Sequence, residues 1–394
     1  MAYSNSNSDV FDVVVIGGGP VGLAAGYEVA KAGSKVMVLE QNNFFNQAGS
    51  SGDLAQFMAK LAIEAMKHWD ALEKDAGVSL RWMGGLLNFG DKDMGGDTPE
   101  VTAEQIEEQY PFKNLDRKWI GLFAPDNGVI NVQLLLRTLY SLAKDYGAQA
   151  KQHTQVKQLR PLESDKSIWE VHAMVHDKDV KYLTKKIIIT SGAYVNHVLK
   201  PSFSIGLRLD IWEMVATYFN TNPGPNGTIF PTLPWGPPNV VRIAVDAATR
   251  TIDDPSQRQA NVFDPRDIQD TQDFVRDHVV GVDATVPAST VSCLQTNVFE
   301  KYLRGGAEKS IAIFTAGWAM KFVPTLGKAL AEMALTGKSD YKLDEFSITR
   351  PAPEGKEIII EDPVSINASA KKEKTLSLSR SDCTQSEGSS CRSS

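Results

Sequence analysis

Three glycines near the start of the chain have the spacing of a phosphate-binding turn. Gly17, Gly19 and Gly22 follow a β-branched run at residues 13–16 and precede a small-residue segment that reaches about residue 31. The first glycine allows a tight turn, the second lets a pyrophosphate approach the backbone, and the third lets a helix lie close to the strand. The free N–H groups and the positive dipole end of that helix then face the phosphates. The spacing therefore predicts a strand, a turn and a helix that bind a dinucleotide.

A carboxylate follows at the end of the next apolar run. Residues 36–39 form that run, and Glu40 comes directly after it. An acid at this strand end can bind the 2′- and 3′-hydroxyls of an adenosine ribose, and it repels a 2′-phosphate. Because strand, turn, helix, second strand and acid come in order, the sequence favours a dinucleotide site over a purely structural turn. The motif does not distinguish one dinucleotide from another.

The polar, glycine-rich segment 41–53 leaves two interpretations open. Its serines, Ser50 and Ser51, could donate hydroxyl groups to the pyrophosphate from the side opposite the glycine turn. The segment could equally be an ordinary surface loop.

Composition restricts the partners of the chain. Its 394 residues are enough for two domains, and a net charge of −7 with a pI near 5.5 argues against nucleic acid or an anionic membrane as the partner. A small-molecule substrate is the better prediction.

No apolar run is long enough to span a bilayer, and the N-terminus has no hydrophobic secretory segment, so we expect an intracellular protein, cytoplasmic or peroxisomal. The C-terminus lacks a peroxisomal address of the Ser-Lys-Leu type. Three cysteines form no disulfide framework and six histidines fit no metal spacing, so we predict no metal site.

Periodicity places the other elements. Helices are expected over the following ranges: 54–76, 102–110 with a capping box of Thr102 and Gln105, 131–146, 264–278 and 325–335. Strands are expected over these ranges: 80–89 as a pair or a bulged strand, 121–130 as an edge strand and turn, 150–159, 168–175, 180–183, 186–193, 207–220, 240–244 and 311–317.

These elements predict an α/β fold with two domains that are discontinuous in sequence. A Rossmann-like domain with a parallel sheet takes residues 9–80, 148–200 and 288–350, and a mixed-sheet substrate domain takes 81–147 and 201–287. Residues 369–394, rich in serine and lysine, are expected to be a disordered tail. A nucleotide fold that is completed by a strand, a glycine and a helix near the C-terminus suits FAD better than NAD, because both ends of the chain then enclose a long cofactor.

Three later stretches resemble the monomeric sarcosine oxidase family of D-amino-acid-oxidase-like flavoproteins. They are residues 291–296, residues 316–324, and residues 334–339 together with 346–351. The resemblance covers roughly residues 9–351 and implies a monomeric FAD-dependent amine oxidase. Such an enzyme oxidises the secondary amine of an N-substituted or cyclic amino acid, of the sarcosine or pipecolate type, with O2 to an imine and H2O2. A fructosyl amino acid oxidase and a catalytically impaired flavoprotein remain the alternatives.

The resemblance also implies residue roles. Cys293 matches the cysteine that forms a thioether to the flavin, although a lone cysteine is more commonly a small buried hydrophobe. Lys321 matches the lysine that binds a substrate carboxylate beside the flavin, and its place just before a helix N-terminus favours negative charge there. We also predict cofactor contacts from Val156, Gly192 and Gly317.

The sequence departs from this family in two ways that matter for catalysis. The loop at Ser50 runs on without the family's substrate-binding arginine, so a bidentate anion clamp is absent at that place. Arg242 stands where the family has the lysine that speeds the reaction with oxygen, and Asp246 replaces its histidine partner. Arginine keeps the positive charge but cannot supply a proton at neutral pH. The impaired-variant alternative rests on these changes and on shortened internal segments.

Overall fold

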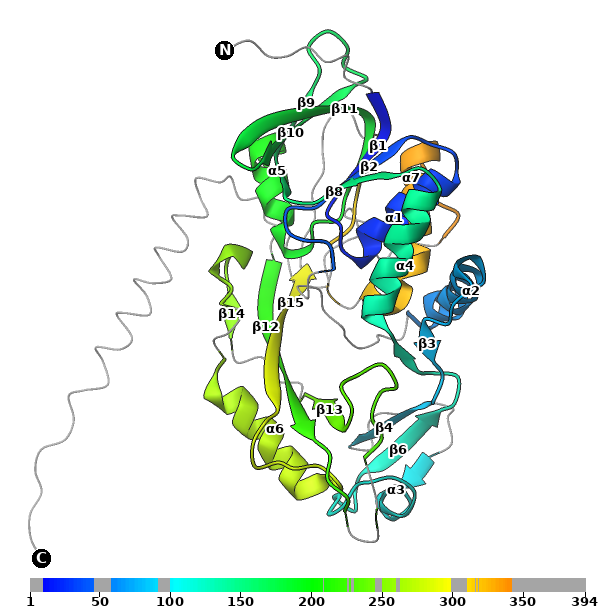
Figure 1. The fold of residues 1–394 in the computed structure, drawn as a ribbon, viewed down its shortest axis with the longest axis vertical. Coiled ribbons are helices and arrows are strands. Elements are labelled where there is room, and N and C mark those ends of the chain that lie inside the picture. Colours follow the sequence, from blue (N-terminus) through cyan, green and yellow to red (C-terminus); the bar gives the residue numbers. More distant parts are fainter. Residues whose placement is uncertain are drawn as a thin grey trace, which may run out of the picture.

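The fold comes from a computed structural model, which describes residues 10–45, 58–90, 100–207, 209–224, 227, 230–244, 250–259, 263–298, 310–315, 317 and 319–341. Two parts are visible in Figure 1, a sheet flanked by helices above and an antiparallel sheet with a long helix below. The predicted α/β class with a parallel-containing sheet is confirmed.

Parallel strands form the centre of the first part. They are β1 (Val10–Ile16), β2 (Val36–Leu39), β8 (Gln149–Lys151), the end of β11 (Lys178–Ile189) and β16 (Ile311–Ile313). The order is β8-β2-β1-β11, and β16 pairs with the other side of β11. Because these strands are parallel, their carboxyl ends meet at one edge of the sheet, which is where a doubly wound fold binds its ligand.

Two strand predictions in this part were wrong in their boundaries. Residues 180–183 and 186–189 belong to one long strand, β11, and residues 190–193 lie beyond its end. Strand β11 pairs antiparallel with β10 (Trp169–Val175), itself paired with β9 (Thr154–Pro161). No glycine or proline separates the two apolar runs, so the strand continues through Lys185. The range 150–159 is split between β8 and β9, because His153 adopts a positive φ of 53° that interrupts an extended strand.

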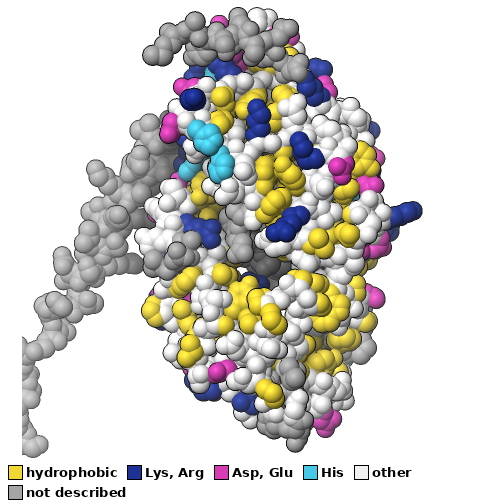
Figure 2. Space-filling model, in the orientation of Figure 1, with side chains coloured by type: hydrophobic (Ala, Val, Ile, Leu, Met, Phe, Trp, Pro, Cys, Tyr) yellow, Lys and Arg dark blue, Asp and Glu magenta, His cyan; other side chains and the backbone are white. Residues whose placement is uncertain are grey.

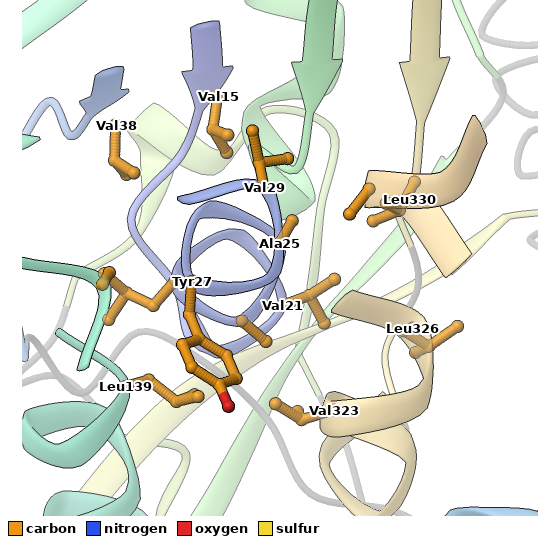
Figure 3. Packing of buried hydrophobic residues seen from close by; sticks show 14 of the residues in the cluster. Val15, Val21, Ala25, Tyr27, Val29, Val38, Leu139, Val323, Leu326 and Leu330 are labelled. Carbon is orange, nitrogen blue, oxygen red and sulfur yellow. The ribbon is translucent and has the colours of Figure 1, made fainter. Parts of the chain in front are cut away.

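Helices cover both faces of this sheet. They are α1 (Pro20–Lys31), α2 (Met58–Ala76), α4 (Val132–Asp145), α5 (Val195–Phe203) and α7 (Val323–Thr336), with short 3₁₀ turns η2 (Gly192–Tyr194) and η5 (Ala319–Phe322). Figure 3 shows α1 in the centre of the core, with Leu139 of α4 on one side and Leu326 and Leu330 of α7 on another. At the α1–α7 contact, a Cβ on Gly327 would lie 2.5 Å from the Ala24 Cβ, so glycine is what permits this close packing.

A second, antiparallel sheet forms the lower part. Strand β12 (Leu209–Asn220) pairs with β15 (Ser289–Val298) on one side, and with β13 (Val240–Ile243) and β14 (Thr251–Ile252) on the other. Helix α6 (Pro265–His278) packs Val275 against Phe219 of β12. The 3₁₀ turn η4 (Pro255–Gln257) follows β14.

Short strands and one helix complete the structure, and most of them lie beside the lower part (Figure 1). They are β3 (Arg81–Trp82), β4 (Leu86–Gly90), β5 (Glu100–Thr102), β6 (Ile120–Ala124), β7 (Val129–Ile130) and α3 (Ala103–Gln109). The predicted capping box of Thr102 and Gln105 on α3 is confirmed. The expected pairing within 80–89 is wrong, because β3 pairs with β7 and β4 pairs with β6. Strand β6 was expected at an edge, yet it lies between β4 and β5, since strands distant in sequence bond to both of its sides.

Two elements lie across the expected domain division. Helix α4, within the range 81–147, packs against α1 in the first part, and β15, within 288–350, pairs with β12 in the second. We therefore propose that residues 132–145 belong with the first domain and residues 289–298 with the second. The expected tail, 369–394, lies outside the described residues.

Candidate active site

A cavity opens at the carboxyl edge of the parallel sheet. The ends of β1, β2, β11 and β16 lead into it, and the turns that follow these strands form its walls. Figure 2 shows the surface hollowed between the upper and lower parts. Segments from both ends of the chain therefore border one cavity, at the place where an open parallel sheet binds its ligand.

The glycine turn forms the base of this cavity. Gly17 has a positive φ of 105°, and a Cβ on Gly22 would lie 1.9 Å from the Gly17 carbonyl oxygen, so helix α1 packs on the turn only with glycine at both positions. Gly19 lines the cavity, and a Cβ added to it would meet nothing within 4 Å. Gly19 is also the N-cap of α1 and makes no side-chain capping bond, so the first N–H groups of the helix are available to an anionic ligand.

Glu40 lies beside the turn with its carboxylate fixed. It is 7% exposed and lines the cavity. Its Oε2 accepts a hydrogen bond from the Gly18 N–H at 2.7 Å, and its Oε1 accepts one from the Asn42 N–H at 2.8 Å. Each carboxylate oxygen can accept a further bond, so Glu40 is oriented to bind hydroxyl groups in the cavity.

Residues at the end of β11 add a polar wall that the sequence analysis did not single out. The buried Ser191 hydroxyl lines the cavity and has no hydrogen-bond partner within the described residues. The Thr190 hydroxyl, in contrast, donates to the Gly17 carbonyl at 3.0 Å. A buried hydroxyl without a partner is costly, and a polar ligand would satisfy it. The only sequence signal was its position between the apolar run 187–189 and Gly192. Gly192 and Val156, both predicted contacts, also line the cavity.

The segment that joins β16 to α7 also borders the cavity. Gly317, Met320 and Val323 line it. The partly buried Lys321 lies in η5 between the last two, and α7 begins directly after η5 without a side-chain cap at its N-terminus. The structure thus places Lys321 in the turn beside the cavity, with the positive end of the α7 dipole next to it, but Lys321 is not among the described residues that line the cavity.

Cys293 and Arg242 are not among the described residues that line the cavity. Leu294 lines the cavity, and strand alternation puts the Cys293 side chain on the other face of β15. Burial raises the pKa of the Cys293 thiol, and the positive charges of Arg242 and Arg258 act against that rise. The thiol is therefore protonated near neutral pH. Arg242 itself is exposed on β13, opposite Tyr218 of β12.

A histidine–carboxylate pair in the cavity wall also went unnoticed in the sequence. His197 of α5 lines the cavity, and its Nε2 lies 2.8 Å from Oδ2 of Asp254, just before η4. Burial favours a higher pKa for Asp254, but hydrogen bonds from Ser256 and His197 outweigh it and lower the pKa to about 2. The pair joins the first part to the second beside the cavity. No local motif marks either residue.

Some predictions fall outside these observations. Ser50 and Ser51 lie outside the described residues, so the structure does not place them. Within the described ranges, no three His, Cys, Asp or Glu side chains gather as metal ligands. None of the helices in the same ranges has the length and hydropathy needed to cross a bilayer.

Comparison with known proteins gives a consistent pattern. The family model described as FAD dependent oxidoreductase matches residues 12–333. A putative bifunctional amine oxidase of Dictyostelium discoideum is 40% identical over 87% of this chain, although the match spans only 37% of that longer protein. A monomeric sarcosine oxidase of a Bacillus species is 25% identical, with 87% of this chain and 96% of that protein covered.

A solved structure agrees with these relatives. The open form of NikD, described as an unusual amino acid oxidase essential for nikkomycin biosynthesis, superposes with a TM-score of 0.74 at 28% sequence identity. The match covers 88% of this chain and 98% of NikD. Similarity therefore extends through both parts of the fold, including the segments that border the cavity.

Proposed function

We propose that this chain, which belongs to the family of FAD dependent oxidoreductases, oxidises the secondary amine of an N-substituted or cyclic amino acid. The substrate is of the sarcosine or pipecolate type, O2 is the electron acceptor, and the products are an imine and H2O2. The relatives named as sarcosine and amine oxidases support this substrate class. The observation that carries the proposal is one cavity that is lined both by the glycine turn and by residues on either side of Lys321.

The residues present fit FAD, the cofactor of the family. Gly19 leaves open space over the N-terminus of α1 for the pyrophosphate, Glu40 presents a fixed carboxylate for ribose hydroxyls, and Ser191 has an unsatisfied buried hydroxyl. Bound in this cavity, FAD would supply the hydride acceptor and the subsequent reaction with oxygen. We propose cofactor contacts from Gly17, Gly19 and Glu40 at the adenosine half, where Gly22 acts by letting α1 pack on the turn. Further contacts come from the following residues elsewhere along the cavity: Val156, Ser191, Gly192 and Gly317.

Lys321 is our candidate for substrate binding. Its ammonium group can pair with a substrate carboxylate, and the N-terminal dipole of α7 adds to the positive potential at that place. Binding the carboxylate there orients the amine and its neighbouring carbon toward the cavity lined by Met320 and Gly317. Lys321 would thus act by orientation and electrostatics, while the amine proton has to leave by another route.

We also propose a covalent bond between the Cys293 sulfur and the flavin ring. In support, Cys293 is a free cysteine and adjoins Leu294, which lines the cavity. Because the two side chains point to opposite faces of β15, this bond requires the ring to reach past Leu294. We expect flavin to stay with the unmodified protein after acid precipitation and to be released from Cys293→Ala. Complete release from the unmodified protein would contradict it.

Arg242 is proposed to aid the reaction with oxygen through its charge. Its positive charge lowers the pKa of the Cys293 thiol against the larger effect of burial, so the charge acts on the face of β15 where we propose the bond to the flavin. A fixed positive charge stabilises superoxide, although an arginine cannot supply a proton at neutral pH.

Spectroscopy and peroxide release test the function together. The purified protein is expected to show a flavin spectrum and to release H2O2 with sarcosine or L-pipecolate, and with fructosyl-valine only if the alternative substrate class is correct. Lys321→Met should weaken substrate binding by about 10- to 100-fold, the value of a charge-assisted hydrogen bond, while flavin content stays the same. Bound flavin without peroxide from any of the three substrates would favour the impaired variant. Absence of flavin would refute the proposal itself.

A further inference from the structure

Two adjacent residues of α2 hold the turn that carries Lys321. The indole Nε1 of Trp69 donates a hydrogen bond to the Lys321 carbonyl oxygen at 2.9 Å. The ring nitrogen Nδ1 of His68 lies 2.9 Å from the Thr325 hydroxyl, in the first turn of α7. One contact thus acts on η5 and the other on the start of α7, with Val323 of the cavity wall between them.

The Trp69 side chain is itself fixed. It is 2% exposed, and the guanidinium of Arg81 lies over its ring at 5.6 Å from the centroid. Arg81 is held in turn by ion pairs to Glu73 at 2.7 Å and to Asp70 at 2.6 Å, both on α2. The indole can therefore move very little, and its hydrogen bond transmits the position of α2 to η5.

His68 is held from its other side as well. Its Nε2 lies 2.9 Å from the Tyr341 hydroxyl, which follows the end of α7, and the two rings meet edge to face. The Thr325 side chain at the other end of this chain of contacts is fully buried. Contacts from His68 therefore reach segments at both ends of α7.

The segment from η5 to the start of α7 lacks a side-chain cap. The N-cap of α7, Phe322, makes no side-chain capping bond, and η5 is a 3₁₀ turn of four residues. Short 3₁₀ turns have poor hydrogen-bond geometry and are weakly stable by themselves. Phe322 and Val323 anchor this segment in the core, and the hydrogen bond from Trp69 adds a fixed contact at the Lys321 backbone itself.

We propose that Trp69, assisted by His68, is a positioning residue for substrate binding, because its indole hydrogen bond sets the place from which Lys321 reaches a carboxylate. This inference rests on the proposed function of Lys321. Helix α2 then contributes to substrate affinity, although none of its described side chains lines the cavity.

Trp69→Phe tests the inference, since it keeps a ring and removes the indole N–H. The probe is tetrahydrofuran-2-carboxylate, in which an ether oxygen replaces a ring nitrogen so that no imine can form, and tetrahydrofuran is the matched probe without a carboxylate. Binding of each is followed through the flavin absorption spectrum. We expect Trp69→Phe to weaken carboxylate binding about 3- to 10-fold, the value of one hydrogen bond, and to leave tetrahydrofuran binding unchanged.

A double-mutant cycle with Lys321→Met separates positioning from general loosening. If Trp69 acts through Lys321, Trp69→Phe has no further effect on the carboxylate probe once Lys321 is Met. Trp169→Phe is the matched control, because Trp169 is 4% exposed and also donates one indole hydrogen bond, to the Ser310 hydroxyl at 3.1 Å. That variant should bind both probes like the unmodified protein.

The outcomes distinguish the inference from its premise. If Lys321→Met binds the carboxylate probe normally, the proposed role of Lys321 fails and the inference fails with it. If Lys321→Met weakens binding but Trp69→Phe does not, only the positioning role is wrong. An equal loss for both probes, or an equal loss in Trp169→Phe, would also overturn it. Should Trp69→Phe purify without flavin, Thr325→Val, which removes the hydroxyl next to His68, decides by the same titration.

Discussion

Gly19→Ala should separate cofactor binding from folding. Gly19 has an ordinary φ of −72°, and an added Cβ would meet no protein atom within 4 Å. Alanine therefore fits the folded chain. Because alanine reduces the backbone freedom of the unfolded chain, the free energy of unfolding should stay unchanged or rise by about 0.4–1 kcal/mol. Gly22→Ala is the matched contrast, because its Cβ would lie 1.9 Å from the Gly17 carbonyl oxygen and would force α1 away from the turn.

The cost of Gly19→Ala should appear in the affinity for FAD. The open space at Gly19 lies over the N-terminus of α1, where a pyrophosphate has to approach the backbone. A methyl group there holds the phosphates away from the N–H donors. Loss of one charge-assisted hydrogen bond costs about 1.5–3 kcal/mol, so we expect FAD to bind about 10- to 100-fold more weakly.

Both effects can be measured on one protein. The variants are made in a Cys293→Ala background so that flavin can be removed, FAD binding is titrated by flavin fluorescence, and the flavin-free protein is unfolded in urea. Gly19→Ala should lose affinity with an unchanged urea midpoint, and Gly22→Ala should lose stability. The reasoning is refuted if Gly19→Ala binds FAD as tightly as its parent, or if it unfolds at clearly lower urea.

Two further outcomes follow from charged groups. Arg242→Gln should slow reoxidation of the reduced protein by O2, because it removes the positive charge, and it should leave anaerobic reduction by substrate unchanged. Stopped-flow absorbance measures the rates of the two steps. Equal slowing of both would contradict this role. Burial lowers the pKa of His68, the Lys328 charge acts in the same direction, and Glu64 and Glu332 oppose it. The unfolded chain therefore binds more protons at this site, so stability should fall as the pH drops below about 6.5, and His68→Gln should reduce that fall. Urea midpoints across this range check it, and an identical pH dependence in the variant would exclude His68 as the cause.

The local steps of the fold could be read from residue types and spacing. The glycine turn between β1 and α1 has its predicted strand and helix, and α3 has its capping box, because φ preferences and capping bonds act over a few neighbouring residues. Glu40 could be placed at the end of β2 for the same reason. These features put one half of the candidate site in place.

Contacts between distant segments could not be read in this way. Nothing local states that β15 pairs along β12, or that Leu294 rather than Cys293 lines the cavity, because β pairing and side-chain facing depend on which partner strand arrives. The unsatisfied Ser191 hydroxyl likewise becomes apparent only when the walls of the cavity are assembled.

The sequence by itself determined a dinucleotide-binding start, an alternation of helices and strands, and a candidate lysine before the last helix, since each is encoded within a short window. The tertiary structure decided how that lysine is held. Trp69 and Lys321 lie 252 residues apart, and their hydrogen bond exists only because burial of the apolar faces of α1, α2 and α7 brings these helices into one core. Packing over the whole chain, rather than local preference, sets that distance.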